Sequence, residues 1–136
     1  MIAVASMSKG VCVPMDVSLP LKVMYELVTQ IRVLTGQNGT IAGFGHLGDC
    51  NLHICMIFPD KEIAASMMKK ITPVMNSFIQ EHSGSVSAEH GIGFAKIKDL
   101  PYSKDPIQIE YMRQLKNLFD PNGIMNPYKI LPERIN

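Results

Sequence analysis

The chain has 136 residues, of which 46% are hydrophobic and 18% charged, and its formal net charge is +1. This length suffices for one domain with a hydrophobic core, and the near-neutral charge offers no electrostatic basis for binding nucleic acid. No apolar run approaches the roughly 20 residues of a membrane span, and the first residues resemble neither a transit peptide nor a secretory signal. The three cysteines lack the spacing of a disulfide framework, so we expect reduced thiols.

The first predicted element is an amphipathic helix that ends at Gly36. Ser18 is expected to cap its N-terminus, and Pro20 is tolerated in its first turn. The apolar residues at helical spacing are expected to face the core, and they are Leu21, Met24, Leu27 or Val28, Ile31 and Leu34.

Two strands are predicted next, over residues 40–46 and 51–58, around the short loop at 47–50. If these residues form a hairpin loop, His46 pairs with Asn51. Alternation along the second strand directs one set of side chains to a single face, namely Leu52, Ile54, Met56 and Phe58.

Two further helices are predicted. Asp60 can cap the first, which should run to about His82 and be kinked by Pro73. Asp105 precedes the second, and residues 124–132 follow it as an extended tail. The side chains of the last helix that are expected to point inward are Tyr111, Met112, Leu115, Leu118 and Phe119. These elements predict one α+β domain, a small antiparallel sheet covered by helices.

Two histidines flank the predicted hairpin loop. In the expected register, His46 and His53 are diagonal neighbours on one face, with Cβ atoms on the order of 7 Å apart. Two imidazoles at that separation can reach one metal ion. The alternative is two histidines on a solvated sheet face, which glycines at 43, 45 and 48 make less favourable because they indicate close backbone approach.

A second candidate pair lies in the small-residue stretch "SAEHGIG". Glu89 and His90 are adjacent, so their side chains diverge and should have different roles. Glu89 has the chemistry of a third metal ligand, and His90 that of a proton acceptor near neutral pH. The alternative is a helix-start glutamate beside an exposed histidine. A metal ion with a neighbouring base suits deprotonation of a hydroxyl group next to a carboxylate, but no motif in the chain would hold a redox cofactor.

Three motifs carry a resemblance to a known family: "GHLGDCNLH", "GSVSAEHGIG" and "DPNGIMNPYKILP". The chain resembles the C-terminal part of the FAD-linked oxidases and dehydrogenases of the vanillyl-alcohol-oxidase type, and the shorter matches "DVSLP" and "YSK" lean toward the D-2-hydroxyglutarate dehydrogenases. The resemblance implies that residues 1–136 are part of a ferredoxin-like substrate domain. The flavin-binding domain would then lie outside this chain.

The resemblance also implies roles by position. His46, His53 and Glu89 match the ligands of a divalent metal, zinc or manganese, and His90 matches the base that removes the hydroxyl proton while hydride goes to FAD. The remaining matched positions are Asn126 and Lys129 on the flavin side, and Asn51 and Cys55 on the substrate side.

The implied reaction oxidises a small 2-hydroxy acid, with D-2-hydroxyglutarate as the first choice and D-lactate as the second. An electron-transfer flavoprotein is the implied acceptor, and the implied location is mitochondrial in a eukaryote and otherwise cytoplasmic. Three departures favour an alternative, a non-catalytic metal-binding or interaction module. Cys50 replaces a turn glycine, Cys55 replaces a substrate-binding asparagine, and Pro14 stands where a lysine would bind a substrate carboxylate.

Overall fold

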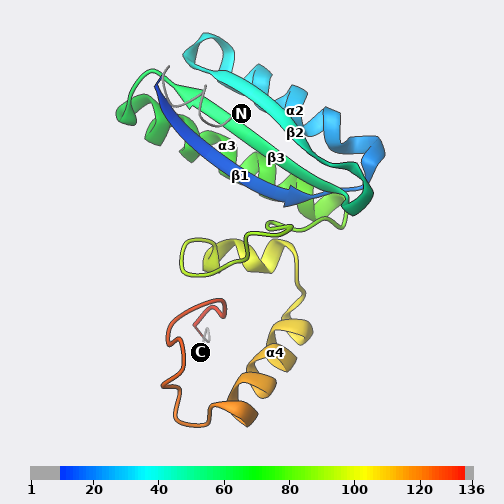
Figure 1. Cartoon of the computed structure of the whole chain (residues 1–136), viewed down its shortest axis with the longest axis vertical. Coiled ribbons are helices and arrows are strands. Elements are labelled where there is room, and N and C mark those ends of the chain that lie inside the picture. Colours follow the sequence, from blue (N-terminus) through cyan, green and yellow to red (C-terminus); the bar gives the residue numbers. More distant parts are fainter. Residues whose placement is uncertain (1–9, 134–136) are drawn as a thin grey trace.

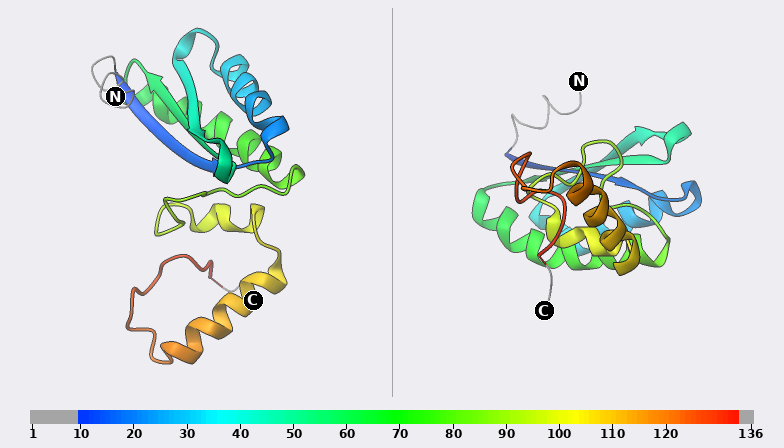
Figure 2. Two further views of the ribbon diagram at one scale, coloured as in Figure 1. Left: turned by 45° about the vertical axis from the view of Figure 1, so that its right-hand side comes forward. Right: turned by 90° about the horizontal axis from the view of Figure 1, so that it is seen from below.

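A three-stranded antiparallel sheet of order β1-β3-β2 forms the centre of the molecule. The structure is a computed structural model that describes residues 10–133. Two helices, α2 and α3, cover one face of the sheet (Figures 1 and 2). This arrangement confirms the predicted α+β class. The bounds are β1 Val11–Ser18, α2 Leu21–Thr35, β2 Thr40–His46, β3 Asn51–Phe58 and α3 Lys61–Glu81.

The core lies between the sheet and these two helices. The predicted alternation along β3 is confirmed, because Leu52, Ile54, Met56 and Phe58 are all buried on the helix side. In α2 the stripe is partly confirmed through Met24, Leu27, Val28 and Ile31. Leu21 and Leu34 are exposed instead, because the buried face of the helix is completed by Val23 and Thr35.

Strand β1 was not predicted, and Ser18 is its last residue rather than a helix cap. Pro20 is the N-cap of α2, with no side-chain cap. The prediction for α3 is confirmed at its start, since the Asp60 carboxylate accepts a hydrogen bond from the Ile63 N–H at 2.8 Å. Pro73 lies inside α3, which continues as one helix to Glu81.

The order β-α-β-β-α is that of a ferredoxin-like fold before its fourth strand. In the described residues the outer edge of β1 receives a single bridge, in which Ser18 and Ser85 exchange two backbone hydrogen bonds of 2.9 and 2.8 Å. The chain then leaves the edge and forms an irregular loop over residues 86–96. This loop replaces a fourth strand and lies beside the end of β1 (Figure 1).

The C-terminal region extends beyond the sheet, as Figure 1 shows. A 3₁₀ helix, Ile97–Tyr102, leads into α4, Pro106–Phe119, which begins directly after Asp105 as expected and is capped by that residue. The prediction that α4 turns its apolar residues inward is wrong for most of them, because the described chain places no layer against that face. The exposed residues are Tyr111, Leu115, Leu118 and Phe119, whereas Ile109 is the buried one.

Candidate metal centre

The hairpin places its two histidines as predicted. His46 is opposite Asn51 in the register of β2 and β3, and the His46 and His53 ring centroids are 5.4 Å apart. Gly45 permits this close pairing, since a Cβ atom there would lie 2.1 Å from the Asn51 carbonyl oxygen. Cys50 closes the turn with φ 55° and ψ 28°, the left-handed conformation that favours glycine.

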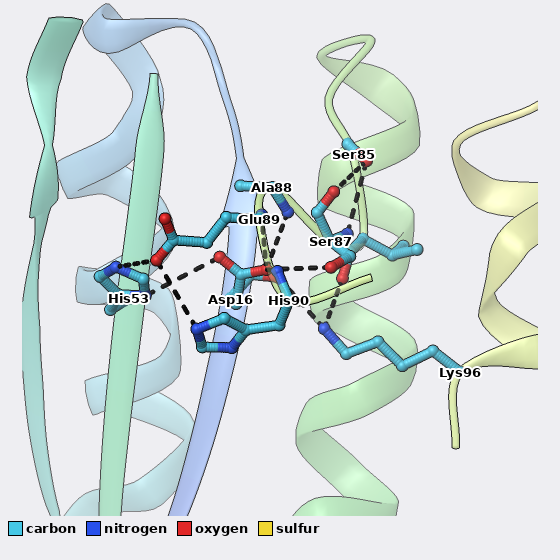
Figure 3. A network of polar contacts seen from close by, with 9 residues as sticks. Asp16, His53, Ser85, Ser87, Ala88, Glu89, His90 and Lys96 are labelled. Carbon is cyan, nitrogen blue, oxygen red and sulfur yellow. Dashed lines mark hydrogen bonds and ion pairs between the residues drawn. The ribbon is translucent and has the colours of Figure 1, made fainter. Parts of the chain in front are cut away.

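The loop after Ser85 brings Glu89 and His90 to the same end of the sheet. Glu89 Oε1 lies 3.1 Å from His53 Nε2 and 3.6 Å from His90 Nε2. The His53 and His90 rings are stacked, with centroids 5.5 Å apart. Figure 3 shows His53 arriving from β3 and the other two from the loop, so three of the residues singled out in the sequence converge here.

The convergence depends on Asp16, a residue that sequence reasoning missed. One carboxylate oxygen, Oδ2, accepts four hydrogen bonds from consecutive loop residues, and Figure 3 shows this network. Asp16 therefore fixes the backbone from which both Glu89 and His90 project. The donors are the Ser87 hydroxyl at 2.9 Å and the N–H groups of Ala88, Glu89 and His90 at 2.9, 3.0 and 3.0 Å.

The charge of Asp16 is stabilised although the residue is only 1% exposed. Burial alone would raise its pKa, but hydrogen bonds from the His90 N–H, the Ser87 hydroxyl and the Glu89 N–H outweigh it and hold the pKa below its ordinary value. The Lys96 ammonium donates to the carbonyl oxygens of Asp16 and Val86 at 3.1 and 2.7 Å. Burial lowers the pKa of Lys96, partly offset by the nearby carboxylate of Asp16.

Four side chains form a set of possible metal ligands: Asp16, His53, Glu89 and His90. Each offers one donor atom, and these atoms lie within 4.8 Å of one another. The donor chemistry of the set, two imidazoles and two carboxylates, fits a divalent cation. Asp16 Oδ1 is buried without a hydrogen bond in the described residues, 3.8 Å from His53 Nδ1. Mixed imidazole and carboxylate ligands suit zinc and also manganese.

His46 lies outside this four-residue set, exposed beside His53. The sequence feature that could have revealed Asp16 is the segment "VCVPMDVS", which forms β1. In this strand the aspartate directly precedes a buried valine. Asn51 is 3% exposed, and its side-chain oxygen has no hydrogen-bond partner in the described chain.

Three other predicted residues lie outside the four-residue set. Cys55 is buried, and its sulfur lies 2.8 Å from that of Cys12 on β1. In the tail, Lys129 Nζ donates to Asn126 Oδ1 at 2.8 Å. Asn126 and Lys129 line a cavity of about 750 Å³ between α4 and the tail.

Sequence comparison identifies the family to which the chain belongs. The family model described as "FAD linked oxidases, C-terminal domain" matches residues 1–130. The chain therefore belongs to this family of FAD-linked oxidase C-terminal domains.

Its relatives include named dehydrogenases of animals and bacteria. The chain is 45% identical over 118 residues to the mitochondrial D-2-hydroxyglutarate dehydrogenase of Bos taurus, with 86% of the chain and 21% of that protein covered. For the mitochondrial enzyme of the same name from Rattus norvegicus the identity is 42% over 120 residues, 88% of the chain and 22% of the relative. A D-2-hydroxyglutarate dehydrogenase of Stutzerimonas stutzeri is 39% identical over 121 residues, 85% of the chain and 26% of the relative.

The chain thus spans between 21% and 26% of the length of these relatives. Within residues 10–133, no helix combines the length and the apolar character needed to cross a membrane.

Proposed function

We propose that the chain is the metal-bearing, C-terminal substrate-domain part of an FAD-dependent D-2-hydroxy-acid dehydrogenase. The observation that carries the proposal is the cluster of His53, Glu89 and His90 at one end of the sheet, held by a buried carboxylate. Membership of the FAD-linked oxidase family supports the redox class.

His46, His53 and Glu89 are the proposed ligands of the divalent metal, zinc or manganese. When bound, the metal would polarise the hydroxyl and carboxylate oxygens of the substrate. His53 presents Nε2 toward Glu89, and the exposed ring of His46 lies against His53 on the same face of the sheet. These contacts give two imidazoles and a carboxylate from two separate segments of the chain.

His90 is the proposed base. Its ring is exposed, so a substrate hydroxyl group can reach it, and it takes the hydroxyl proton on an imidazole nitrogen. The Glu89 carboxylate, 3.6 Å from His90 Nε2, stabilises the imidazolium that results. Hydride transfer to FAD would require the flavin domain, so the isolated chain should not turn over substrate.

D-2-hydroxyglutarate is the first-choice substrate because relatives from animals and a bacterium carry that name, and D-lactate is the second choice. Asn51 is a proposed substrate contact through its buried side-chain oxygen, which has no hydrogen-bond partner in the part of the chain that the structure describes. Cys55 is the second proposed substrate contact, but its thiol faces Cys12. Pro14 offers no positive charge to a substrate carboxylate. Both features should weaken the binding of a second carboxylate.

The tail is proposed to face the flavin domain. Asn126 and Lys129 are the residues expected on that side, and they line a hollow together with Leu115, an exposed apolar residue of α4. An electron-transfer flavoprotein is the proposed acceptor, and mitochondria are the proposed location by resemblance to relatives named as mitochondrial.

The test is reduction of the flavin by substrate in a protein that includes the flavin domain. His90→Ala should lower the rate by roughly 10²- to 10⁴-fold, because the hydroxyl proton loses its acceptor. His82→Ala is the matched control, since His82 packs on Phe78 with ring centroids 4.3 Å apart and lies outside the four-residue set. An unchanged rate for His90→Ala would exclude His90 as the base.

The alternative is a non-catalytic module that binds metal. It is favoured by Cys55, whose thiol contacts Cys12 although the family places a substrate-binding asparagine there. This alternative predicts stoichiometric metal binding through His46, His53 and Glu89, with no flavin reduction when a flavin domain is supplied. Full reduction by D-2-hydroxyglutarate would exclude it.

A further inference from the structure

We propose that Asp16 is the positioning residue of the metal centre: one carboxylate oxygen holds the loop that carries Glu89 and His90, and the other orients His53. This inference rests on the proposed function, because it assigns a role in the same site.

The first half of the argument concerns Oδ2. Four donors from residues 87–90 converge on this one atom at 2.9 to 3.0 Å. Three of them are consecutive backbone N–H groups, so the carboxylate fixes the direction in which Glu89 and His90 leave the backbone. Without an acceptor, these N–H groups would have to find water, and residues 87–90 would lose the contacts that hold them to β1.

The second half concerns Oδ1. This oxygen is buried and has no hydrogen bond from any residue between 10 and 133. It faces His53 Nδ1 at 3.8 Å, while Nε2 of the same ring faces Glu89 at 3.1 Å. The ring therefore presents Nδ1 to the Asp16 carboxylate and Nε2 to the cluster. A carboxylate behind a histidine fixes its tautomer and raises its basicity as a ligand.

Register makes this possible. Asp16 is directly opposite His53 in the β1–β3 ladder, so both side chains stand on the same face of the sheet. Lys96 closes the network from the other side through the Asp16 carbonyl oxygen (Figure 3). The carboxylate is thus held by backbone geometry before any ligand arrives.

The main test compares the binding of Zn²⁺ and Mn²⁺ to the wild-type chain and to Asp16→Asn by isothermal titration calorimetry. Asparagine keeps the size and one acceptor oxygen but loses the charge behind His53, so we expect affinity to fall roughly 10- to 100-fold. Asp120→Asn is the matched control. Asp120 is 6% exposed and accepts hydrogen bonds from the Ile124 and Met125 N–H groups, but it lies in the C-terminal region. Its substitution should leave metal affinity within about twofold.

The outcomes separate the inference from the proposed function. If wild type binds metal and Asp16→Asn binds equally well, the role of Asp16 is overturned and the metal site stands. If wild type binds neither metal, the metal site and this inference fail together. A second measurement uses the wild-type chain alone, so it tests the inference even if the variant misfolds. In the ¹⁵N spectrum of the Zn²⁺-loaded chain, His53 should carry its proton on Nδ1 and bind through Nε2. Metal on Nδ1 overturns the inference.

A different observation supports a second inference. The sulfur atoms of Cys12 and Cys55 lie 2.8 Å apart on adjacent strands, and neither thiol is in a disulfide. We propose that this pair is a thiol oxidation site. A small disulfide such as oxidised glutathione would accept two electrons and two protons from the two thiols, giving two molecules of reduced glutathione and one Cys12–Cys55 bond.

The location supports a pair rather than a single reactive thiol. Cys12 is opposite Ile57 and Cys55 is opposite Pro14, so the two are diagonal neighbours across the β1–β3 ladder. Burial, together with the hydrogen bond and the charge interaction with Cys55, raises the pKa of Cys12 to about 11. Thiolate is therefore scarce at neutral pH, and the reaction should accelerate as pH rises.

The test exposes the native chain to oxidised glutathione at pH 8 and maps the products by peptide mass spectrometry. The expected product has lost two hydrogen atoms, with Cys12 and Cys55 linked. Cys50→Ser is the control, since that half-buried thiol lies outside the pair, and it should not change the linkage. Recovery of three reducible thiols, or a linkage through Cys50, overturns the inference.

Discussion

The sheet with α2 and α3 differs sharply from α4 with its tail in how it buries apolar side chains. Leu27 in α2 and Ile79 in α3 are 0% exposed, whereas Leu118 and Phe119 in α4 are 73% and 79% exposed. Both regions have the apolar spacing of an amphipathic helix. The comparison shows that such spacing identifies a face that needs a partner, but not where in the chain the partner lies.

The two regions also differ in the range of their polar contacts. Asp16 ties β1 to a loop more than 70 residues further along the chain. Asp120 makes the same kind of contact with backbone N–H groups only four and five residues away. The buried carboxylate of the sheet region therefore makes contacts distant in sequence, and the buried carboxylate of the α4 region makes local ones.

The largest expected effect comes from truncating one leucine in each region. Leu27→Ala should destabilise the chain by about 2–5 kcal/mol, because it leaves a cavity in the core. Leu118→Ala should change stability by no more than about 0.5 kcal/mol, because its side chain is exposed. Urea unfolding followed by circular dichroism measures both. Equal losses would show that α4 packs as tightly as α2.

The hairpin offers a second pair. Gly45→Ala should destabilise the chain by about 1–3 kcal/mol and weaken metal binding, because its Cβ would collide with the Asn51 carbonyl oxygen. Gly48→Ala is the control, since among the described residues only its own chain neighbours could come within 4 Å of its Cβ position, and its φ is not in the left-handed region. Both are measured by urea unfolding and metal titration. If Gly45→Ala left stability and metal binding unchanged, the hairpin would be less tightly packed than the rest of the sheet region.

Acid should affect the two regions through different carboxylates. The folded-state pKa of Asp16 is lowered, so its contribution to stability is present above its unfolded pKa of about 3.9 and is lost as pH falls through the lower folded value. Metal-free wild type should therefore lose stability below about pH 4, and Asp16→Asn should lose less.

The pKa of Asp120 is also lowered in the folded state, chiefly because of the hydrogen bond from Lys116. Its substitution by asparagine should leave the acid response of the sheet region unchanged. Urea midpoints measured from pH 3 to pH 6 check both variants. A flattened acid response in Asp120→Asn would contradict the independence of the two regions.

The smallest effect is expected at Cys50. Its φ of 55° costs a non-glycine residue roughly 1 kcal/mol, so Cys50→Gly should stabilise the chain by about 0.5–1 kcal/mol. Cys50→Ser keeps the same strain and should give no gain. Thermal unfolding compares the three chains, and a loss of stability in Cys50→Gly would show that the side chain contributes packing that outweighs its backbone strain.

Local signals predicted much of the fold. The pairing of His46 with Asn51 followed from loop length, and the inward face of β3 followed from alternation. The cap at Asp60 followed from a side chain that bonds to a nearby backbone N–H group, and the start of α4 at Pro106 followed from the tolerance of proline in a first helical turn. Each of these features is decided within a few residues of sequence.

Features set by distant contacts were not predicted. Strand β1 was missed because its pairing partner lies 33 to 47 positions away. It contains Pro14, which an edge strand tolerates. Asp16 was missed with it. The approach of Glu89 to His53 could not be derived from spacing, since it requires the carboxylate of β1 to hold the loop.

The Asp16 network also has a consequence for the order of assembly. β1 leaves the ribosome long before residues 87–90, so a nascent chain that has only formed its hairpin holds a carboxylate with no donors. Closing a contact of that sequence separation is entropically costly and comes late in folding. Metal binding at the complete centre would therefore require a chain that has finished folding. The two hairpin histidines alone require only the first steps of folding.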